Sequence, residues 1–164
     1  MPSIPMAEAL ELKLATLSDA RQIGLMSCEF IEYGLPWSWD EARVARQIRR
    51  HDTTVLIARM EARLVGFAIM RFFDDSTHLN LLAVDAGFRR QSIGRRLLEW
   101  LEKSARVAGT FVVSLEVRAS NQGARAFYQQ LGYTEIVSIP NYYGGRETAI
   151  RMTRDLRCRP LLTP

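Results

Sequence analysis

The sequence predicts an α+β fold, in which one mixed β-sheet of about seven strands is flanked by about four helices. Three observations support this expectation. The 164 residues suffice for one hydrophobic core and leave little room for a second. Segments that alternate apolar and polar residues are interspersed with segments of helical periodicity. A strand–helix–strand unit between residues 78 and 118 should be a right-handed crossover between two parallel strands.

The first elements are one strand and two helices. Residues 9–15 alternate apolar and polar side chains, which predicts a strand. A helix is expected over residues 18–30. Ser38 and Glu41 have the spacing of a capping box, so a second helix is expected over about 39–50.

The middle of the chain predicts four strands and a long helix. Strands 53–60 and 63–72 are separated by two residues, so they should pair as a hairpin. Residues 78–84 and 111–118 form two further strands, and a helix from about 93 to 108 joins them. One stripe of that helix should be buried against the sheet. The stripe consists of Ile93, Leu97, Leu101, Ala105 and Ala108.

The last third predicts a short helix and two strands. The helix spans residues 121–131, and Gly132 stands at a plausible C-cap position. Two strands follow near 133–139 and 147–153. Together with the earlier segments they complete a single mixed sheet.

The composition is that of a soluble globular domain, with 48% hydrophobic and 24% charged residues. We expect one domain over residues 1–156 and a loose tail over 157–164, which carries two prolines. The formal net charge is +4, and all but two of the 22 basic residues are arginine. Because arginine pairs with phosphates and carboxylates, this excess fits an anionic ligand, although it also fits nucleic acid or general solubility.

Several classes of protein are disfavoured. Two cysteines, Cys28 and Cys158, cannot form a disulfide framework. The two histidines, His51 and His78, lack partners at metal-ligand spacing, so no metal is expected. Neither a signal peptide nor an apolar run of membrane-spanning length is evident, so we expect a cytoplasmic protein without membrane contact.

Residues 83–98 form the most informative motif, because they join the end of a strand to the start of a helix. Small residues at 92 and 94 let the backbone approach a ligand closely. The first N–H groups of a helix have no intrahelical partner and attract anions, and the flanking arginines add charge. The spacing matches neither a Walker loop nor a dinucleotide fingerprint. An ordinary helix start with solvated arginines is the alternative interpretation.

The motif resembles the acetyl-CoA loop of the GNAT superfamily of N-acetyltransferases, Arg/Gln-x-x-Gly-x-Gly/Ala. The matching residues are Arg89, Ser92 and Gly94. Ser92 stands where the family usually has glycine, so the loop is expected to avoid a positive φ at this position.

The resemblance extends to the bacterial ribosomal-protein-alanine (RimI-like) subgroup and is strongest over residues 79–152. Thr148 departs from the subgroup's usual aspartate. The matching segments are Pro36-Trp37-Ser38, Leu115 to Asn121, Ala126-Phe127-Tyr128, Leu131-Gly132-Tyr133, Asn141-Tyr142-Tyr143 and Gly145 to Met152.

The resemblance implies residues that bind acetyl-CoA, the co-substrate. The strand before the loop would lend backbone groups to the acetyl and pantetheine portion, and the loop would hold the pyrophosphate. Asn121 would hydrogen-bond the pantetheine arm, although it also suits a helix N-cap. The implied positions are Leu82, Ala83, Val84, Arg89, Arg90, Gln91, Ser92, Ile93, Gly94, Arg95, Asn121 and Tyr128.

The resemblance also implies two catalytic residues. Glu116 would be the general base, since the attacking amine must lose a proton. Strand alternation places it opposite Val113, Leu115 and Val117. Tyr128 would be the general acid that protonates the departing CoA thiolate. A surface or Arg-paired glutamate and an aromatic anchor are the respective structural alternatives.

An acceptor groove would be lined by Glu32, Trp37, Tyr142 and Tyr143, of which strand alternation turns only one tyrosine inward. The expected function is acetylation of a primary amine, most plausibly a protein N-terminal α-amine, by a monomer or homodimer. The alternatives are acetylation of lysine or a small amine, and a non-catalytic acyl-CoA-binding regulatory module. A nucleic-acid-binding domain is disfavoured because no known motif accompanies the basic residues.

Overall fold

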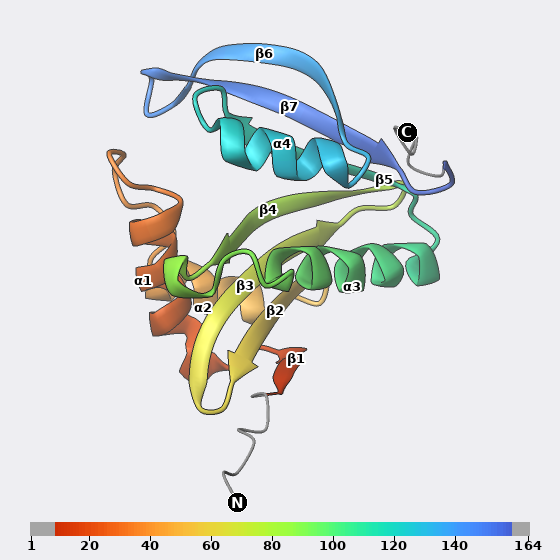
Figure 1. The fold of residues 1–164 in the computed structure, drawn as a ribbon. Helices are drawn as coiled ribbons and strands as arrows, with labels where there is room; N and C mark the ends of the chain where they lie inside the picture. Colours follow the sequence, from red (N-terminus) through yellow and green to blue (C-terminus); the bar gives the residue numbers. More distant parts are fainter. Residues whose placement is uncertain (1–8, 159–164) are drawn as a thin grey trace, which may run out of the picture.

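The computed structural model describes residues 9–158, which form one seven-stranded mixed sheet (Figure 1). The strand order is β1-β2-β3-β4-β5-β7-β6, and only β4 and β5 pair in parallel. The predicted α+β class and the parallel pair are therefore confirmed. The strands are β1 (Leu10–Leu14), β2 (Thr53–Met60), β3 (Arg63–Phe72), β4 (Ser76–Val84), β5 (Val112–Arg118), β6 (Thr134–Tyr143) and β7 (Glu147–Asp155).

The helices lie on both faces of the sheet. They are α1 (Ala20–Phe30), α2 (Glu41–Arg49), α3 (Ile93–Ala108) and α4 (Gln122–Gln130), with short 3-10 turns at Leu17–Asp19 and Ala86–Phe88. In Figure 1, α3 covers one face of β2 and β3, while α1 and α2 lie behind it. Within the described residues, the helices are too short or too polar for any of them to span a bilayer.

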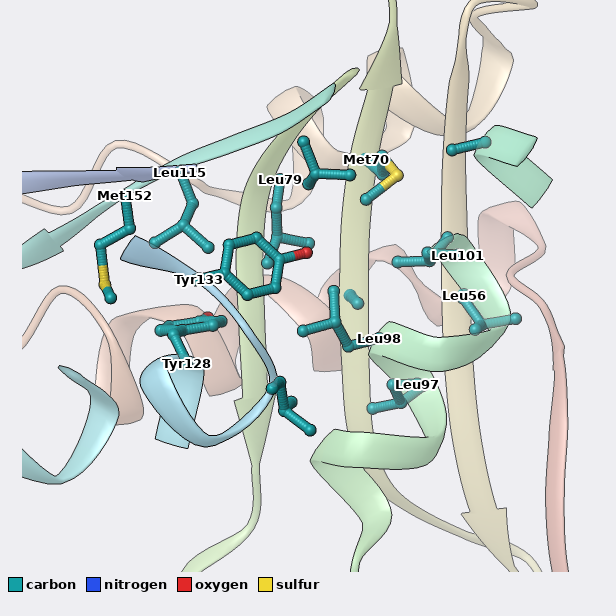
Figure 2. Close-up of a cluster of buried hydrophobic side chains, with 14 of the residues drawn as sticks. Leu56, Met70, Leu79, Leu97, Leu98, Leu101, Leu115, Tyr128, Tyr133 and Met152 are labelled. Atoms are coloured by element: carbon teal, nitrogen blue, oxygen red, sulfur yellow. The ribbon is translucent and has the colours of Figure 1, made fainter. Parts of the chain in front are cut away.

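Two hydrophobic clusters fill the space between the helices and the sheet. The larger one packs α3 and α4 against the sheet (Figure 2) and contains Leu97, Leu101 and Tyr133. The smaller one packs α1 and α2 against the other face. The predicted stripe of α3 is buried apart from Ala108, which is exposed in the last turn of the helix.

The sheet opens between β4 and β5. These strands pair only where Ser76–His78 meets Val112–Ser114, and no pairing continues toward their C-terminal ends. The pairing of β3 with β4 shifts between Ile69 and Met70, so that Asn80 is an extra residue. Such a bulge bends a strand and re-aims its side chains, which is why bulges are common beside active sites. As a result, Leu79 packs in the larger cluster and Leu81 in the smaller one.

The predicted capping box at the start of α2 is wrong. The helix begins at Glu41, and the side chain of Asp40 caps it by accepting a hydrogen bond from the Arg43 N–H at 2.9 Å. Ser38 instead donates its hydroxyl to Glu32. Both serine and aspartate suit an N-cap, so the spacing alone did not decide between them. The tail expected over 157–164 lies outside the described residues from position 159 onward.

Candidate active site

The opening between β4 and β5 forms a cleft with an empty volume of about 590 Å³. One side is the bulged part of β4, and the other is the C-terminal half of β5. The end of α1, helix α4 and the end of β6 complete the walls. The lining residues are Phe30, Ile31, Leu79, Asn80, Leu81, Leu82, Leu115, Glu116, Val117, Arg118, Asn121, Ala124, Tyr128 and Tyr143. The cleft therefore brings together residues from both the expected cofactor site and the expected catalytic pair.

Glu116 lies in this cleft and is held by side chains from two neighbouring strands. Its Oε2 lies 2.5 Å from Nε2 of His78 on β4, and its Oε1 accepts a hydrogen bond of 2.9 Å from Nε of Arg151 on β7. The carboxylate is 8% exposed, whereas His78 is 30% and Arg151 is 41% exposed. Burial acts to raise the pKa of Glu116, but the hydrogen bonds and charges of its two partners outweigh burial and lower that pKa.

Tyr128 lies on α4 and is buried at the cleft. Its ring makes edge-to-face contacts with Phe127 at 5.1 Å and with Tyr133 at 5.7 Å between centroids (Figure 2 shows Tyr128 beside Tyr133). These contacts fix the ring, so Tyr128 is an aromatic anchor of α4 as well as a residue of the cleft. Burial, helped by nearby Tyr143, raises the pKa of the phenol well above its usual range. Tyr128 therefore keeps its proton at neutral pH and is a weaker acid than a phenol in water.

The loop before α3 has the features of an anion site. Arg90 and Ser92 have positive φ values of 64° and 60°, and no side chain caps the helix. The expectation that Ser92 would avoid positive φ is therefore wrong. A residue other than glycine in the left-handed conformation costs about 1 kcal/mol. The fold tolerates this cost where the chain turns into the helix. The first N–H groups of α3 have no partner within the helix, so they can bind phosphate oxygens.

The arginines of this loop are exposed and differ in their contacts. Arg89 donates from Nε to the carbonyl of Val84 at 3.2 Å, which ties the loop to the end of β4. Arg95 donates to Glu99 one turn along α3, at 2.8 Å. A Cβ on Gly94 would stand 3.4 Å from the Phe127 ring, so α4 packs closely against the start of α3.

Only some of the residues of β4 and α4 that were expected to contact the co-substrate line the cleft. Leu82 lines the cleft, whereas the side chain of Ala83 is buried in the smaller hydrophobic cluster. Val84 packs against the larger cluster. Asn121 lines the cleft and also caps α4, because its side chain accepts a hydrogen bond from the Ala124 N–H at 3.1 Å.

Of the four residues expected to line the acceptor groove, Glu32 is buried and the other three are at least partly exposed. Glu32 is 7% exposed, and its carboxylate accepts hydrogen bonds from Ser27, from the N–H and hydroxyl of Ser38, and from the Trp39 N–H. It therefore organises the loop before α2. Trp37, in that loop, is exposed.

The two tyrosines at the end of β6 differ in exposure, but the pairing of β6 with β7 is irregular between Ile139 and Tyr143, so simple strand alternation does not apply there. Tyr143 lines the cleft, whereas Tyr142 is exposed, and their rings meet edge to face at 4.9 Å. The charge of Glu116 helps to raise the pKa of both phenols, after burial. Both tyrosines therefore lie on the side of the cleft where the carboxylate is.

Two residues of the site were not expected from the sequence. Arg118 is buried and donates from Nη2 to the carbonyls of Ile31 and Tyr33, at 2.8 and 2.7 Å, which fixes the chain after α1. The sequence pattern around His78 bears only on metal binding. Its pairing with Glu116 depends on the register of β4 and β5, which the crossover pattern alone does not give.

The cleft suits a long co-substrate with phosphate at one end and a reactive group at the other. The uncapped start of α3 can hold the phosphates, while the carboxylate of Glu116 and the phenol of Tyr128 line the interior. Proton-accepting and proton-donating groups in one cleft are what an acyl transfer to an amine requires. The fold and the site thus fit the class of the acyltransferases.

The comparisons with known proteins specify the family. Residues 19–133 match the Acetyltransferase (GNAT) family, and the chain belongs to this family of N-acetyltransferases. It is 35% identical over 143 residues to the [Ribosomal protein bS18]-alanine N-acetyltransferase of Escherichia coli K12, covering 84% of this chain and 95% of the relative. The enzyme of the same name from Salmonella typhimurium is 37% identical over 123 residues, covering 73% and 81%.

Solved structures agree with this assignment. The crystal structure of the ribosomal-protein-S18-alanine N-acetyltransferase from Escherichia coli has a TM-score of 0.79 and 28% identity, covering 95% of this chain and 99% of that one. The PaiA N-acetyltransferase of Thermoplasma acidophilum, solved in complex with coenzyme A, shares the fold with a TM-score of 0.75 at 18% identity, covering 90% and 99%.

Proposed function

We propose that this enzyme transfers the acetyl group of acetyl-CoA to the N-terminal α-amine of a protein. The observation that carries the proposal is the cleft between β4 and β5, because Glu116 and Tyr128 both line it. The relatives from Escherichia coli K12 and Salmonella typhimurium, at 35% and 37% identity, are named for acetylating the alanine of a ribosomal protein. A ribosomal-protein N-terminus is therefore the acceptor to test first.

The residues present fit acetyl-CoA. Its pyrophosphate would be held by the N–H groups of Ser92 to Arg95 and by the flanking Arg89 and Arg90. Its pantetheine arm would lie in the cleft beside Leu82 and Asn121. When bound, acetyl-CoA supplies the thioester whose acetyl group is transferred.

Glu116 would receive the proton that the amine must lose. Only a neutral amine has the lone pair that forms the new C–N bond, and an α-amine has a pKa of about 8, against about 10.4 for lysine. The lowered pKa of Glu116 keeps it ionised and ready to accept this proton, directly or through water. As the C–S bond breaks, Tyr128 would give its proton to the CoA sulfur and regain one from solvent.

The acceptor would enter past the exposed aromatic side chains. Trp37, in the loop before α2, and Tyr142, near the end of β6, are exposed, and Tyr143 lines the cleft itself. In this proposal Glu32 holds the Trp37 loop in place through four hydrogen bonds instead of contacting the acceptor. Positioning the amine in line with the thioester would then supply much of the rate enhancement.

The test is CoA release from acetyl-CoA with three acceptors: a ribosomal-protein N-terminal peptide, a lysine peptide with a blocked N-terminus, and a polyamine. Turnover on the free N-terminal peptide is expected. Turnover only on lysine or the polyamine would replace the acceptor class. If no acceptor is used but acetyl-CoA raises the melting temperature, the chain is an acyl-CoA-binding module.

A further inference from the structure

We propose that His78 is a positioning residue that controls Glu116, such that the carboxylate accepts the amine's proton only while His78 is uncharged. This inference rests on the proposed function, since it assigns a second group to the same proton transfer. It is carried by the 2.5 Å contact between His78 Nε2 and Glu116 Oε2, which joins β4 to β5 next to their three-residue pairing.

The contact requires a proton between the two groups. Two lone pairs cannot face each other at this separation, so either the imidazole Nε2 or the carboxyl oxygen carries a hydrogen. When His78 is neutral, its Nε2–H orients the carboxylate without neutralising its charge. When His78 is an imidazolium, the full positive charge stabilises the ionised carboxylate and makes Glu116 a weaker base.

The contact with Asn80 is compatible with both the neutral and the protonated form of His78. The ring Nδ1 lies 3.0 Å from Oδ1 of Asn80, and this atom can accept a hydrogen bond from an imidazolium. If the Asn80 amide is turned over, its NH₂ group donates to the Nδ1 lone pair of a neutral imidazole instead. Asn80 is the extra residue of the β4 bulge, so the bulge brings this reversible partner to His78.

The other charged groups around the pair leave His78 as the responsive member. Arg151 on β7 donates to the far oxygen of Glu116 and keeps its charge throughout the working pH range. Tyr142 on β6 has its pKa raised by burial and by Glu116, so it stays neutral. The hydrogen bond to Glu116 raises the pKa of His78 above its usual 6.5, although burial and Arg151 oppose this. His78 therefore takes up its proton at a higher pH than a free imidazole does.

The first experiment is an NMR titration of the imidazoles, and it needs no substrate. The chain has only two histidines, His51 and His78, and the His51→Gln variant assigns their signals in untagged protein. His78 should titrate above 6.5 in the wild type and shift downward toward that value in Glu116→Gln. An unchanged titration in Glu116→Gln would overturn the proposal, whatever the acceptor proves to be.

The second experiment is the pH profile of kcat/KM on the acceptor that the wild type uses. Both His78 and the amine must lose a proton, so the acid limb should have a limiting slope of about two in the wild type and about one in His78→Gln. The exposed His51→Gln is the matched control and should retain a slope of about two. His78→Thr is a second variant in case His78→Gln does not fold. A slope of about two in a folded variant without His78 would contradict the assignment. A wild type without turnover on any amine would instead count against the proposed function.

Discussion

Two buried glutamates of this protein are each paired with an arginine of β7, yet they lie in different surroundings. Glu116 lies in the cleft with Arg151 and His78, both of which reach solvent. Glu102 on α3 is 2% exposed, lies 2.5 Å from Nη1 of Arg154, and accepts a hydrogen bond of 3.4 Å from the Tyr133 hydroxyl.

The same pair of residue types thus has two different protonation equilibria. Around Glu102, burial raises the pKa of the carboxyl, and the attraction of Arg154 offsets this only in part. Around Glu116, burial acts in the same direction, but His78 and Arg151 reverse it and lower the pKa. A buried glutamate–arginine pair is therefore no sign of catalysis by itself. What distinguishes Glu116 is the open cleft and the histidine.

The largest expected difference between the two glutamates is in turnover. Glu116→Gln should lower kcat by about 100- to 10,000-fold, because a neutral amide cannot accept the proton of the amine. Glu102→Gln should leave kcat near the wild-type value, since Glu102 does not line the cleft. Steady-state kinetics on one acceptor at saturating acetyl-CoA measures both. Equal losses in the two variants would remove the distinction.

The next difference is in stability, and it runs the other way. Arg154→Gln should lower the free energy of unfolding by about 3 kcal/mol, because the buried carboxylate of Glu102 loses the charge that partly offsets its burial. Arg151→Gln should cost less than about 1 kcal/mol, since Arg151 is well exposed. Urea denaturation with unchanged m-values checks the two numbers. A greater loss of stability in Arg151→Gln would show that the Glu116 pair is structural.

Double-mutant cycles sharpen the contrast. Glu102→Gln combined with Arg154→Gln should be more stable than the sum of the single changes by at least about 1 kcal/mol, because the second change removes the stranded charge. Glu116→Gln with Arg151→Gln should differ from additivity by less than about 0.5 kcal/mol. The free energies of unfolding of all six variants provide the comparison.

The smallest effect is the pH dependence of stability, which should have opposite signs at the two sites. The folded pKa of Glu116 is lowered, so its contribution is present above the ordinary value of 4.5 and is lost as pH falls through the folded pKa. The folded pKa of Glu102 is raised, so its contribution is present below 4.5 and is lost as pH rises through the folded pKa. Urea denaturation of the wild type and the two glutamine variants from about pH 3 to pH 8 measures both trends. Each variant should lack the trend of the glutamate that it replaces.

The sequence was sufficient for the elements whose pattern is local. The hairpin of β2 and β3 follows from alternation across a two-residue turn, and α3 begins at Ile93 and ends at Ala108, the bounds that its periodicity predicts. Glu116, Asn121 and Tyr128 were expected on the resemblance, and all three line the cleft.

Features that depend on three-dimensional register could not be read from the sequence. The His78–Glu116 contact arises from the offset of two strands that are 38 residues apart in the chain. The left-handed conformation of Ser92 is imposed by the turn into α3, against the preference of serine. Glu32 was expected to face the acceptor, but four donors of the neighbouring residues enclose it.

The most direct test of the proposed activity uses one peptide with two competing amines. A peptide that begins with alanine and carries a single internal lysine is incubated at about pH 8 with acetyl-CoA and the wild-type enzyme. Tandem mass spectrometry then locates the acetyl group. We expect it on the α-amine, at a rate that falls at least about 100-fold in Glu116→Gln and little in Glu102→Gln. An acetyl group only on the lysine, or α-amine acetylation that Glu116→Gln leaves unchanged, would contradict the proposed mechanism.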